Sequence, residues 1–75
     1  MTKHEFIQEL EFVLNTEAGM LTEDTVLSSV SGWDSTGMLG VIAIYDDLGL
    51  AIPVTEIRES SRVADLIDLA GSAIR

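Results

Sequence analysis

Apolar residues recur every three or four positions in three segments of this 75-residue chain, which is the spacing of an amphipathic helix. The segments span residues 3–15, 35–48 and 62–73, and no segment alternates apolar and polar residues as a strand would. A single short turn of helix is expected at 54–59, after Pro53. We therefore predict an all-α fold, a small antiparallel bundle of three main helices plus one short helix.

The first helix is the most regular of the three. Thr2 is expected to cap it, with Glu5 completing a capping box. Its apolar stripe consists of Phe6, Ile7, Leu10, Val13 and Leu14. The acids Glu5, Glu9 and Glu11 are expected on the solvent side.

The second helix is expected to begin with Asp34 or Ser35 as its cap and to end before Gly49. Its predicted core stripe is Met38, Val41, Ile42, Tyr45 and Leu48, with Gly37 at the edge. The opposite, outer face holds Thr36, Leu39, Gly40, Ala43, Asp46 and Asp47. Gly37 and Gly40 each cost a helix interior about 1 kcal/mol relative to alanine, so a reason other than helix stability must place them there.

The remaining segments are a loop and a last helix. Residues 16–33 lack a period and predict a long ordered loop, held by burial of Leu21, Val26 and Leu27. Ser60 or Ser61 is expected to cap the last helix. The core stripe of that helix is Val63, Leu66, Ile67, Ala70 and Ile74.

Charge and composition narrow the classes of partner and the location that the chain is expected to have. The chain is expected to form a single domain over residues 1–75, with 13 acidic and 4 basic residues and a net charge of −9. That charge disfavours nucleic acid and anionic membrane surfaces as partners, because both repel an acidic protein. The sequence shows no signal peptide, no membrane span and no cysteine, so the expected location is the cytoplasm.

The residues give little support for catalysis or metal binding. His4 is the only histidine, and it is expected to be a solvated residue in the first turn of the first helix. Asp46 and Asp47 are adjacent, so on a helix they point in different directions and do not form a metal site. We therefore expect neither an enzyme nor a metalloprotein.

The junction Gly32-Trp33-Asp34-Ser35 leads from the loop into the second helix. A serine at that place is expected to be exposed at the positive end of the helix. A phosphate on its oxygen would meet free backbone N–H groups and a favourable dipole. From the local residues alone, an ordinary capped helix start explains the same pattern.

The whole chain resembles the acyl carrier protein family, which includes peptidyl and D-alanyl carriers. The resemblance rests on Gly32-Trp33-Asp34-Ser35, the helix ending Asp46-Asp47-Leu48-Gly49, Ile52-Pro53 and Val63-Ala64-Asp65-Leu66. It implies that a phosphopantetheinyl transferase attaches 4′-phosphopantetheine to Ser35, preceded by Asp34. The thiol of that arm would carry an acyl or aminoacyl group as a thioester. The implied partners are a loading ligase and downstream synthases or transferases.

The resemblance also implies a docking surface for those enzymes. Its acidic contacts would be Asp34, Asp46, Asp47 and Glu56, and its apolar contacts Thr36, Leu39 and Ala43. The chain departs from the family in having Thr36 after the serine, Gly37 and Gly40 in place of acids, and Arg58 in the short helix. These departures favour a carrier of a specialised lipid, polyketide or peptide pathway over a general fatty-acid carrier.

Two interpretations remain open at this point. The first is a monomeric, non-catalytic carrier whose reactive group is an arm on Ser35, with acyl and aminoacyl cargo both possible. The second is a small acidic helical adaptor or inhibitor that binds a basic protein surface and is never modified.

Overall fold

In a computed structural model that describes residues 1–75, helix α1 spans Lys3–Val13 and begins with the predicted capping box. The Glu5 N–H donates to Thr2 Oγ1 at 3.1 Å, and the Thr2 N–H donates to a Glu5 carboxylate oxygen at 2.9 Å. These bonds satisfy amide groups that the first turn of a helix leaves without partners.

Helix α2 spans Ser35–Asp47, close to the predicted range. Asp34 is its N-cap, and the Asp34 carboxylate accepts a hydrogen bond from the Gly37 N–H at 2.9 Å. Leu48 is the C-cap, and Gly49 follows with φ of +75°, a value that glycine adopts without strain. Both predicted ends of this helix are therefore confirmed.

The C-terminal half contains two short helices, α3 at Val54–Glu59 and α4 at Val63–Leu69. Helix α4 is shorter than the predicted range of 62–73, because the chain continues as a 3₁₀ turn over Gly71–Ala73. The expected serine cap is also wrong. The start of α4 is closed by the Asp65 carboxylate, which accepts from the Ser61 and Arg62 N–H groups at 2.9 and 3.0 Å.

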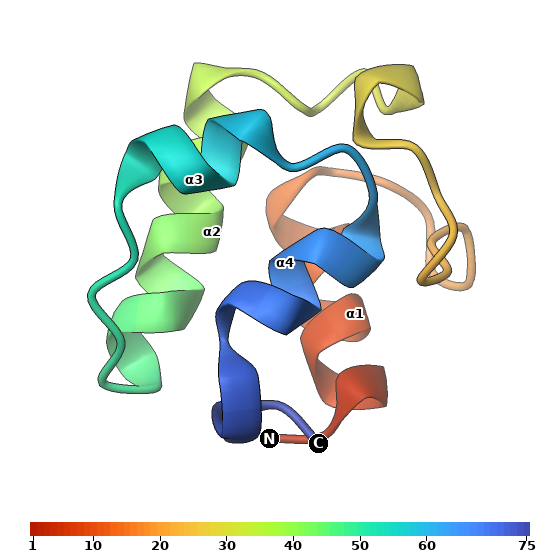
Figure 1. Ribbon diagram of the computed structural model, residues 1–75. Helices are drawn as coiled ribbons and strands as arrows, with labels where there is room; N and C mark the ends of the chain where they lie inside the picture. The colour runs from red at the N-terminus through yellow and green to blue at the C-terminus, as the bar shows by residue number, and fades with distance from the viewer.

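The four helices form a small all-α bundle with no strand, as predicted. Helix α1 packs against α2 and α4. Helix α2 runs antiparallel to α1, whereas α4 crosses α1 obliquely (Figure 1). Helix α3 packs against α2 and lies across it (Figure 1). The two chain ends meet at the bottom of this view, where the Lys3 N–H donates to the Arg75 carbonyl at 2.8 Å.

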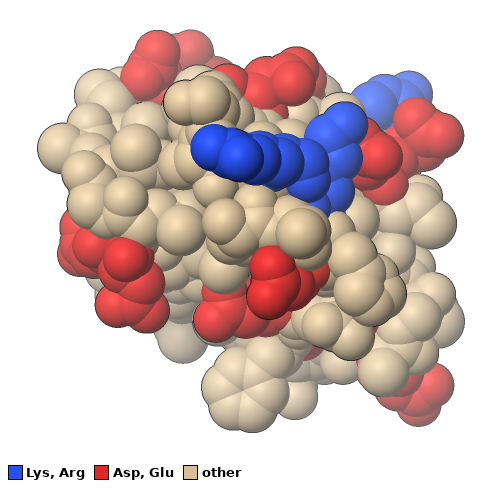
Figure 2. Space-filling view, turned by 90° about the horizontal axis from the view of Figure 1, so that it is seen from below, with Lys and Arg blue, Asp and Glu red and all other residues tan.

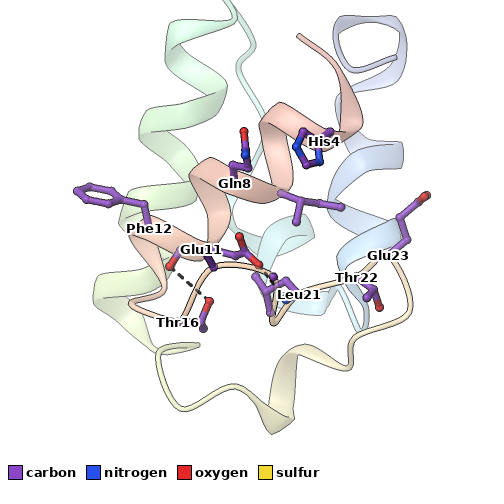
Figure 3. A pocket seen from close by; sticks show the side chains of 11 residues that line it. His4, Gln8, Glu11, Phe12, Thr16, Leu21, Thr22 and Glu23 are labelled. Atoms are coloured by element: carbon purple, nitrogen blue, oxygen red, sulfur yellow. Dashed lines mark hydrogen bonds between the residues drawn. The ribbon is translucent and has the colours of Figure 1, made fainter.

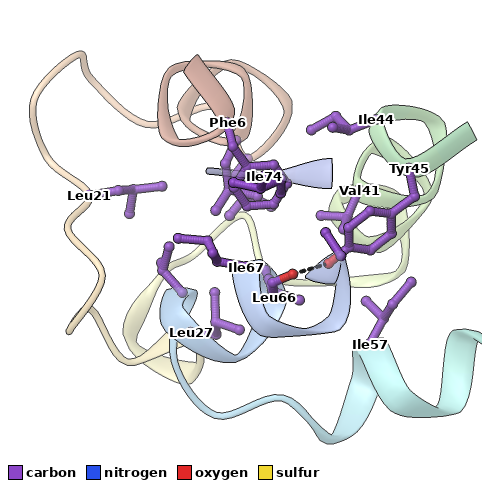
Figure 4. Packing of buried hydrophobic residues seen from close by; sticks show 14 residues of the cluster. Phe6, Leu21, Leu27, Val41, Ile44, Tyr45, Ile57, Leu66, Ile67 and Ile74 are labelled. Atoms are coloured by element: carbon purple, nitrogen blue, oxygen red, sulfur yellow. Dashed lines mark hydrogen bonds between the residues drawn. The ribbon is translucent and has the colours of Figure 1, made fainter. Parts of the chain in front are cut away.

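The core lies between α1, α2 and α4 (Figure 4). Phe6 and Tyr45 stack with ring centroids 6.2 Å apart. The Tyr45 hydroxyl donates to the Leu66 carbonyl at 2.6 Å, and burial raises the pKa of this phenol. Every residue of the predicted last-helix stripe is buried: Val63, Leu66, Ile67, Ala70 and Ile74.

The buried face of α2 differs from the predicted stripe. Val41 and Tyr45 are buried as predicted, but Ile42 is only half-buried and Ile44 is buried in its place. The reason is the position of α1, which packs against α2 beside Gly40. This contact rotates the buried face toward Ile44.

One acid of α1 is not on the solvent side. Glu11 is only 6% exposed, and its carboxylate accepts a hydrogen bond from the Leu21 N–H at 3.0 Å (Figure 3). The bond satisfies an amide of the loop that has no helical partner, so the carboxylate ties the loop to α1. The expectation of a solvated Glu11 was therefore wrong, while Glu5 and Glu9 are exposed.

The long loop between α1 and α2 is ordered by burial and by backbone pairing. Leu21 and Leu27 are buried as predicted, whereas Val26 is 38% exposed. Val26 instead forms an isolated β-bridge with Arg62. The adjoining Leu27 N–H donates to the Ser61 carbonyl at 2.8 Å, so the loop is held to the start of α4.

Candidate functional site

Ser35 is the first residue of α2, and it is exposed. The capping bond at this end of the helix is made by Asp34, which leaves the Ser35 hydroxyl free of that task. Thr36, the next residue, is exposed as well. The expectation of an exposed serine at a helix N-terminus is confirmed, while its modification stays a prediction.

The chain enters α2 through a tight contact with the end of α1. A Cβ atom on Gly32 would lie 1.9 Å from the Leu14 carbonyl oxygen, and one on Gly37 would lie 2.1 Å from the Gly32 carbonyl oxygen. Real Cβ atoms do not approach other atoms so closely. The two glycines therefore let the end of the loop, the end of α1 and the first turn of α2 pack directly against one another.

Trp33 restrains the end of the loop, directly before Asp34 and Ser35. Its side chain is half-buried and packs against the core, and its backbone N–H donates to the Val30 carbonyl at 3.0 Å. An indole held in this way restrains the two residues that follow it, Asp34 and Ser35. The local sequence thus places an exposed hydroxyl on a restrained backbone.

Two groups of opposite charge lie at this end of α2, the backbone N–H groups of the first turn and the carboxylate of Asp34. The free N–H groups of the first turn carry a partial positive charge, which favours an anionic group on a nearby oxygen. Asp34 adds a carboxylate directly before Ser35, and it occupies the Gly37 N–H. A phosphate ester on Ser35 would meet the helix dipole together with this carboxylate.

The predicted partner-binding residues all lie on the surface. On α2 the exposed set is Thr36, Leu39, Ala43, Asp46 and Asp47. Leu39 is 65% exposed, and Glu56 is exposed on the neighbouring helix α3. Asp46 follows Ser35 by three turns, about 16 Å along the helix axis. The apolar contact and the acids are therefore spread along α2 rather than gathered at the serine.

One member of the predicted outer face belongs elsewhere. Gly40 is half-buried, and a Cβ atom there would lie 2.6 Å from the Val13 Cβ. Its role is the close crossing of α1 and α2, which explains this glycine, as the contact with Gly32 and Leu14 explains Gly37. Sequence periodicity could not reveal this role, because it depends on where α1 packs.

Phe12 was not assigned any function from the sequence, and it is the most exposed of the large apolar side chains at 85%. The sequence pattern did indicate that Phe12 would be exposed, since Phe12 falls outside the predicted apolar stripe of the first helix. In Figure 3 its ring points away from Glu11 and Leu21.

The remaining residues considered from the sequence are His4 and the acidic side chains. His4 is exposed in the first turn of α1, as expected. No group of three or more histidine, aspartate or glutamate side chains is placed to hold a metal ion. The cavity of about 620 Å³ in Figure 3 lies between α1 and the loop, and neither Ser35 nor any other residue of α2 lines it.

None of the helices has the length and apolar character needed to cross a membrane.

On the face that carries both chain ends, acidic side chains are spread widely while the basic ones gather in one part (Figure 2). Two of the basic residues are engaged: Lys3 pairs with Glu23 at 3.5 Å, and Arg62 donates to the Asp24 carbonyl at 2.6 Å. The acids of α2 face solvent.

Comparisons of the chain with family models, with curated proteins and with solved structures gave no match. The functional interpretation therefore rests on the residues and on their geometry.

Proposed function

We propose that the protein is an acyl carrier protein, which holds acyl or aminoacyl intermediates as thioesters on a 4′-phosphopantetheine arm attached to Ser35. The observation that carries this proposal is the exposed Ser35 hydroxyl on the first residue of α2, next to the capping residue Asp34. The resemblance of the whole chain to carrier proteins supports it.

The chemistry of attachment suits this position. In the transfer, the Ser35 oxygen would attack the phosphorus of coenzyme A that bears the pantetheine arm. The phosphoanhydride bond of coenzyme A would break, adenosine 3′,5′-bisphosphate would leave, and the hydroxyl proton would pass to a base of the transferase. The ester retains a negative charge, which the free N–H groups at the start of α2 stabilise. The chain has no cysteine, so the reactive thiol would come entirely from the arm. In this proposal the protein itself catalyses no reaction.

The exposed face of α2 would bind the partner enzymes. Leu39 would supply an apolar contact, while Asp46 and Asp47 would attract a basic patch on the partner. Glu56 on α3 would extend the acidic surface, and Thr36 and Ala43 are small enough for close approach. The expected partners are a phosphopantetheinyl transferase, a loading ligase, and synthases or transferases that use the cargo.

The departures from the family pattern support a specialised pathway. Gly37 is buried against Gly32 and Leu14, so an acid at that position would not fit without movement of the backbone. The upper part of α2 is consequently less acidic than in the general family pattern, and electrostatic steering there would be weaker. We place this carrier in the cytoplasm, in a lipid, polyketide or peptide pathway.

The test is the mass of the intact protein after co-expression with a promiscuous phosphopantetheinyl transferase. The wild type is expected to gain one 4′-phosphopantetheine group, and Ser35→Ala is expected to gain none. Ser31→Ala is the matched control, because Ser31 is an exposed serine just before the same helix, and it is expected to be modified like the wild type. An unchanged mass with several active transferases would reject the carrier and favour the unmodified acidic adaptor.

The cargo is a separate question for the modified protein. Incubation with ligases that load acyl groups and with ligases that load amino acids, followed by mass measurement, distinguishes the two classes. A thioester is expected with one class only, and it is expected to be released by hydroxylamine.

A further inference from the structure

Phe12 stands on the outer side of α1 with 85% of its surface exposed, and no part of the chain covers it. A single exposed apolar residue is common on protein surfaces and carries no argument alone. Phe12, however, also lines an open groove of about 640 Å³ between α1 and α2. The Phe12 ring thus borders this groove on one side and the cavity of Figure 3 on the other.

The floor of this groove is apolar and shallow. It is formed by Val13 of α1 and by Gly40, Ala43 and Ile44 of α2. Gly40 permits the two helices to cross closely, since any side chain at that position would collide with Val13. A groove between two helices, floored by small and branched residues, has the form that accepts an apolar side chain from a partner helix.

The rim of the groove is acidic. Glu5 and Glu9 line it from α1, and Asp47 lines it from α2. The one positive group among its lining residues is the amino terminus of Met1, which donates to the Ala73 carbonyl at 3.1 Å. A second copy of this chain, also with a net charge of −9, would bring like charges to this rim. The charge pattern therefore favours a basic protein partner over self-association.

We propose that the groove between α1 and α2 is a docking site for a basic amphipathic helix of a partner protein. The partner would place an apolar side chain on the groove floor beside Phe12, and lysine or arginine side chains against Glu5, Glu9 and Asp47. Exposed aromatic residues at the centre of such contacts commonly supply most of the binding energy. Acids at the rim set the approach and the orientation.

This surface is additional to the one proposed for carrier function. The two share Ala43 and Asp47, but Phe12 and Glu9 lie on α1, and Leu39 does not line the groove. The groove does not include Ser35. The proposal therefore stands or falls independently of the modification of that serine.

The test is a titration of the ¹⁵N-labelled protein with a synthetic amphipathic helical peptide made of leucine and lysine, followed by NMR. The amide signals expected to shift are those of residues 5–13 and 40–47. Phe12→Ala keeps the net charge and is expected to weaken binding about tenfold, the effect of losing an aromatic anchor. Met20→Ala also removes a largely exposed apolar side chain, one that lies in the loop outside both proposed surfaces, and as the control it is expected to change affinity less than about twofold.

A further variant tests the contribution of the acidic rim to binding separately from that of Phe12. Glu9→Gln is expected to weaken binding at low salt and to have little effect at high salt, because salt screens an exposed charge. All three variants alter exposed positions and are expected to melt like the wild type. Unchanged affinity for Phe12→Ala, or shifts centred on Leu39, would overturn the proposal. A wild-type dimer that Phe12→Ala dissociates would overturn it in favour of a second copy.

Discussion

At the scale of single residues, the glycines of α2 reveal where the helix meets other segments. Gly37 is buried, and its hydrogen takes the place where a side chain would strike the Gly32 carbonyl and a Leu14 methyl group. Gly40 plays the same part at the crossing with Val13. Each glycine weakens the isolated helix by about 1 kcal/mol and allows a closer tertiary contact in return.

Gly37→Ala tests this interpretation. At an ordinary helix position, alanine would raise the free energy of unfolding by about 1 kcal/mol. Here we expect it to fall by about 1–3 kcal/mol, because the added methyl group overpacks the contact with Gly32. Chemical denaturation measures the difference. Ala43→Gly, at an exposed position of the same helix, calibrates the ordinary propensity effect, and a stabilised Gly37→Ala would contradict the packing argument.

Residues whose roles are local could be predicted from the sequence. The capping pair of Thr2 and Glu5 involves residues three positions apart, and Gly49 follows directly after the helix that it ends. Both features could therefore be predicted from the nearby sequence. Glu11 could not be predicted, because its burial depends on the Leu21 amide ten residues away. The exposure of Ser35 followed from its place at a helix start, and that is the part of the site that sequence alone supplied.

At the scale of elements, the short helices depend on contacts from outside themselves. Helix α4 has seven residues, too few to persist alone in water. Its first turn is closed by Asp65, and the loop pairs with it through Val26 and Arg62. The burial of Val26 was predicted wrongly for this reason: its segment is held by backbone bonds to a distant element, which hydrophobic patterns do not record.

The Asp65 cap predicts a pH dependence of stability. Hydrogen bonds from the Arg62 and Ser61 N–H groups lower the pKa of this carboxyl group below its ordinary value of 3.8. Because the folded pKa is depressed, the contribution is present above the unfolded pKa and is lost as pH falls through the folded one. Thermal melts are expected to show Asp65→Asn less stable than the wild type at neutral pH, with the gap closing as the pH falls through the lowered pKa of Asp65.

Asp68→Asn is the control for this prediction, since Asp68 is exposed in the same helix. It is expected to melt close to the wild type at both pH values. A gap between wild type and Asp65→Asn that stays constant with pH would contradict the capping role of the carboxylate.

At the scale of the whole molecule, the fold class was predictable because helical periodicity is repeated in independent segments. The stripe of α2 was predicted only in part, because the most deeply buried side of a helix depends on the neighbours against which it packs. Ile44 is buried, and Ile42 packs against the edge of the core while only half-buried, since α1 packs beside Gly40. The whole molecule measures 26 × 23 × 18 Å along its principal axes, and it carries a net charge of −9 within that small volume.

That charge predicts a dependence of stability on salt. Like charges this close repel one another, and added ions screen the repulsion. The melting temperature is therefore expected to rise with sodium chloride. The double variant Asp46→Asn, Asp47→Asn removes two exposed charges from α2 and is expected to melt higher at low salt and to respond less to added salt. A melting temperature independent of ionic strength would show that self-repulsion is negligible here.

The single tryptophan of the chain has a practical consequence. Trp33 sits half-buried two residues before Ser35, so the only indole fluorophore lies beside the hydroxyl that would carry the arm. Its emission colour follows the polarity of its surroundings. Attachment at Ser35, or an enzyme settling over the start of α2, can thus be followed by intrinsic fluorescence in an unlabelled sample, in real time.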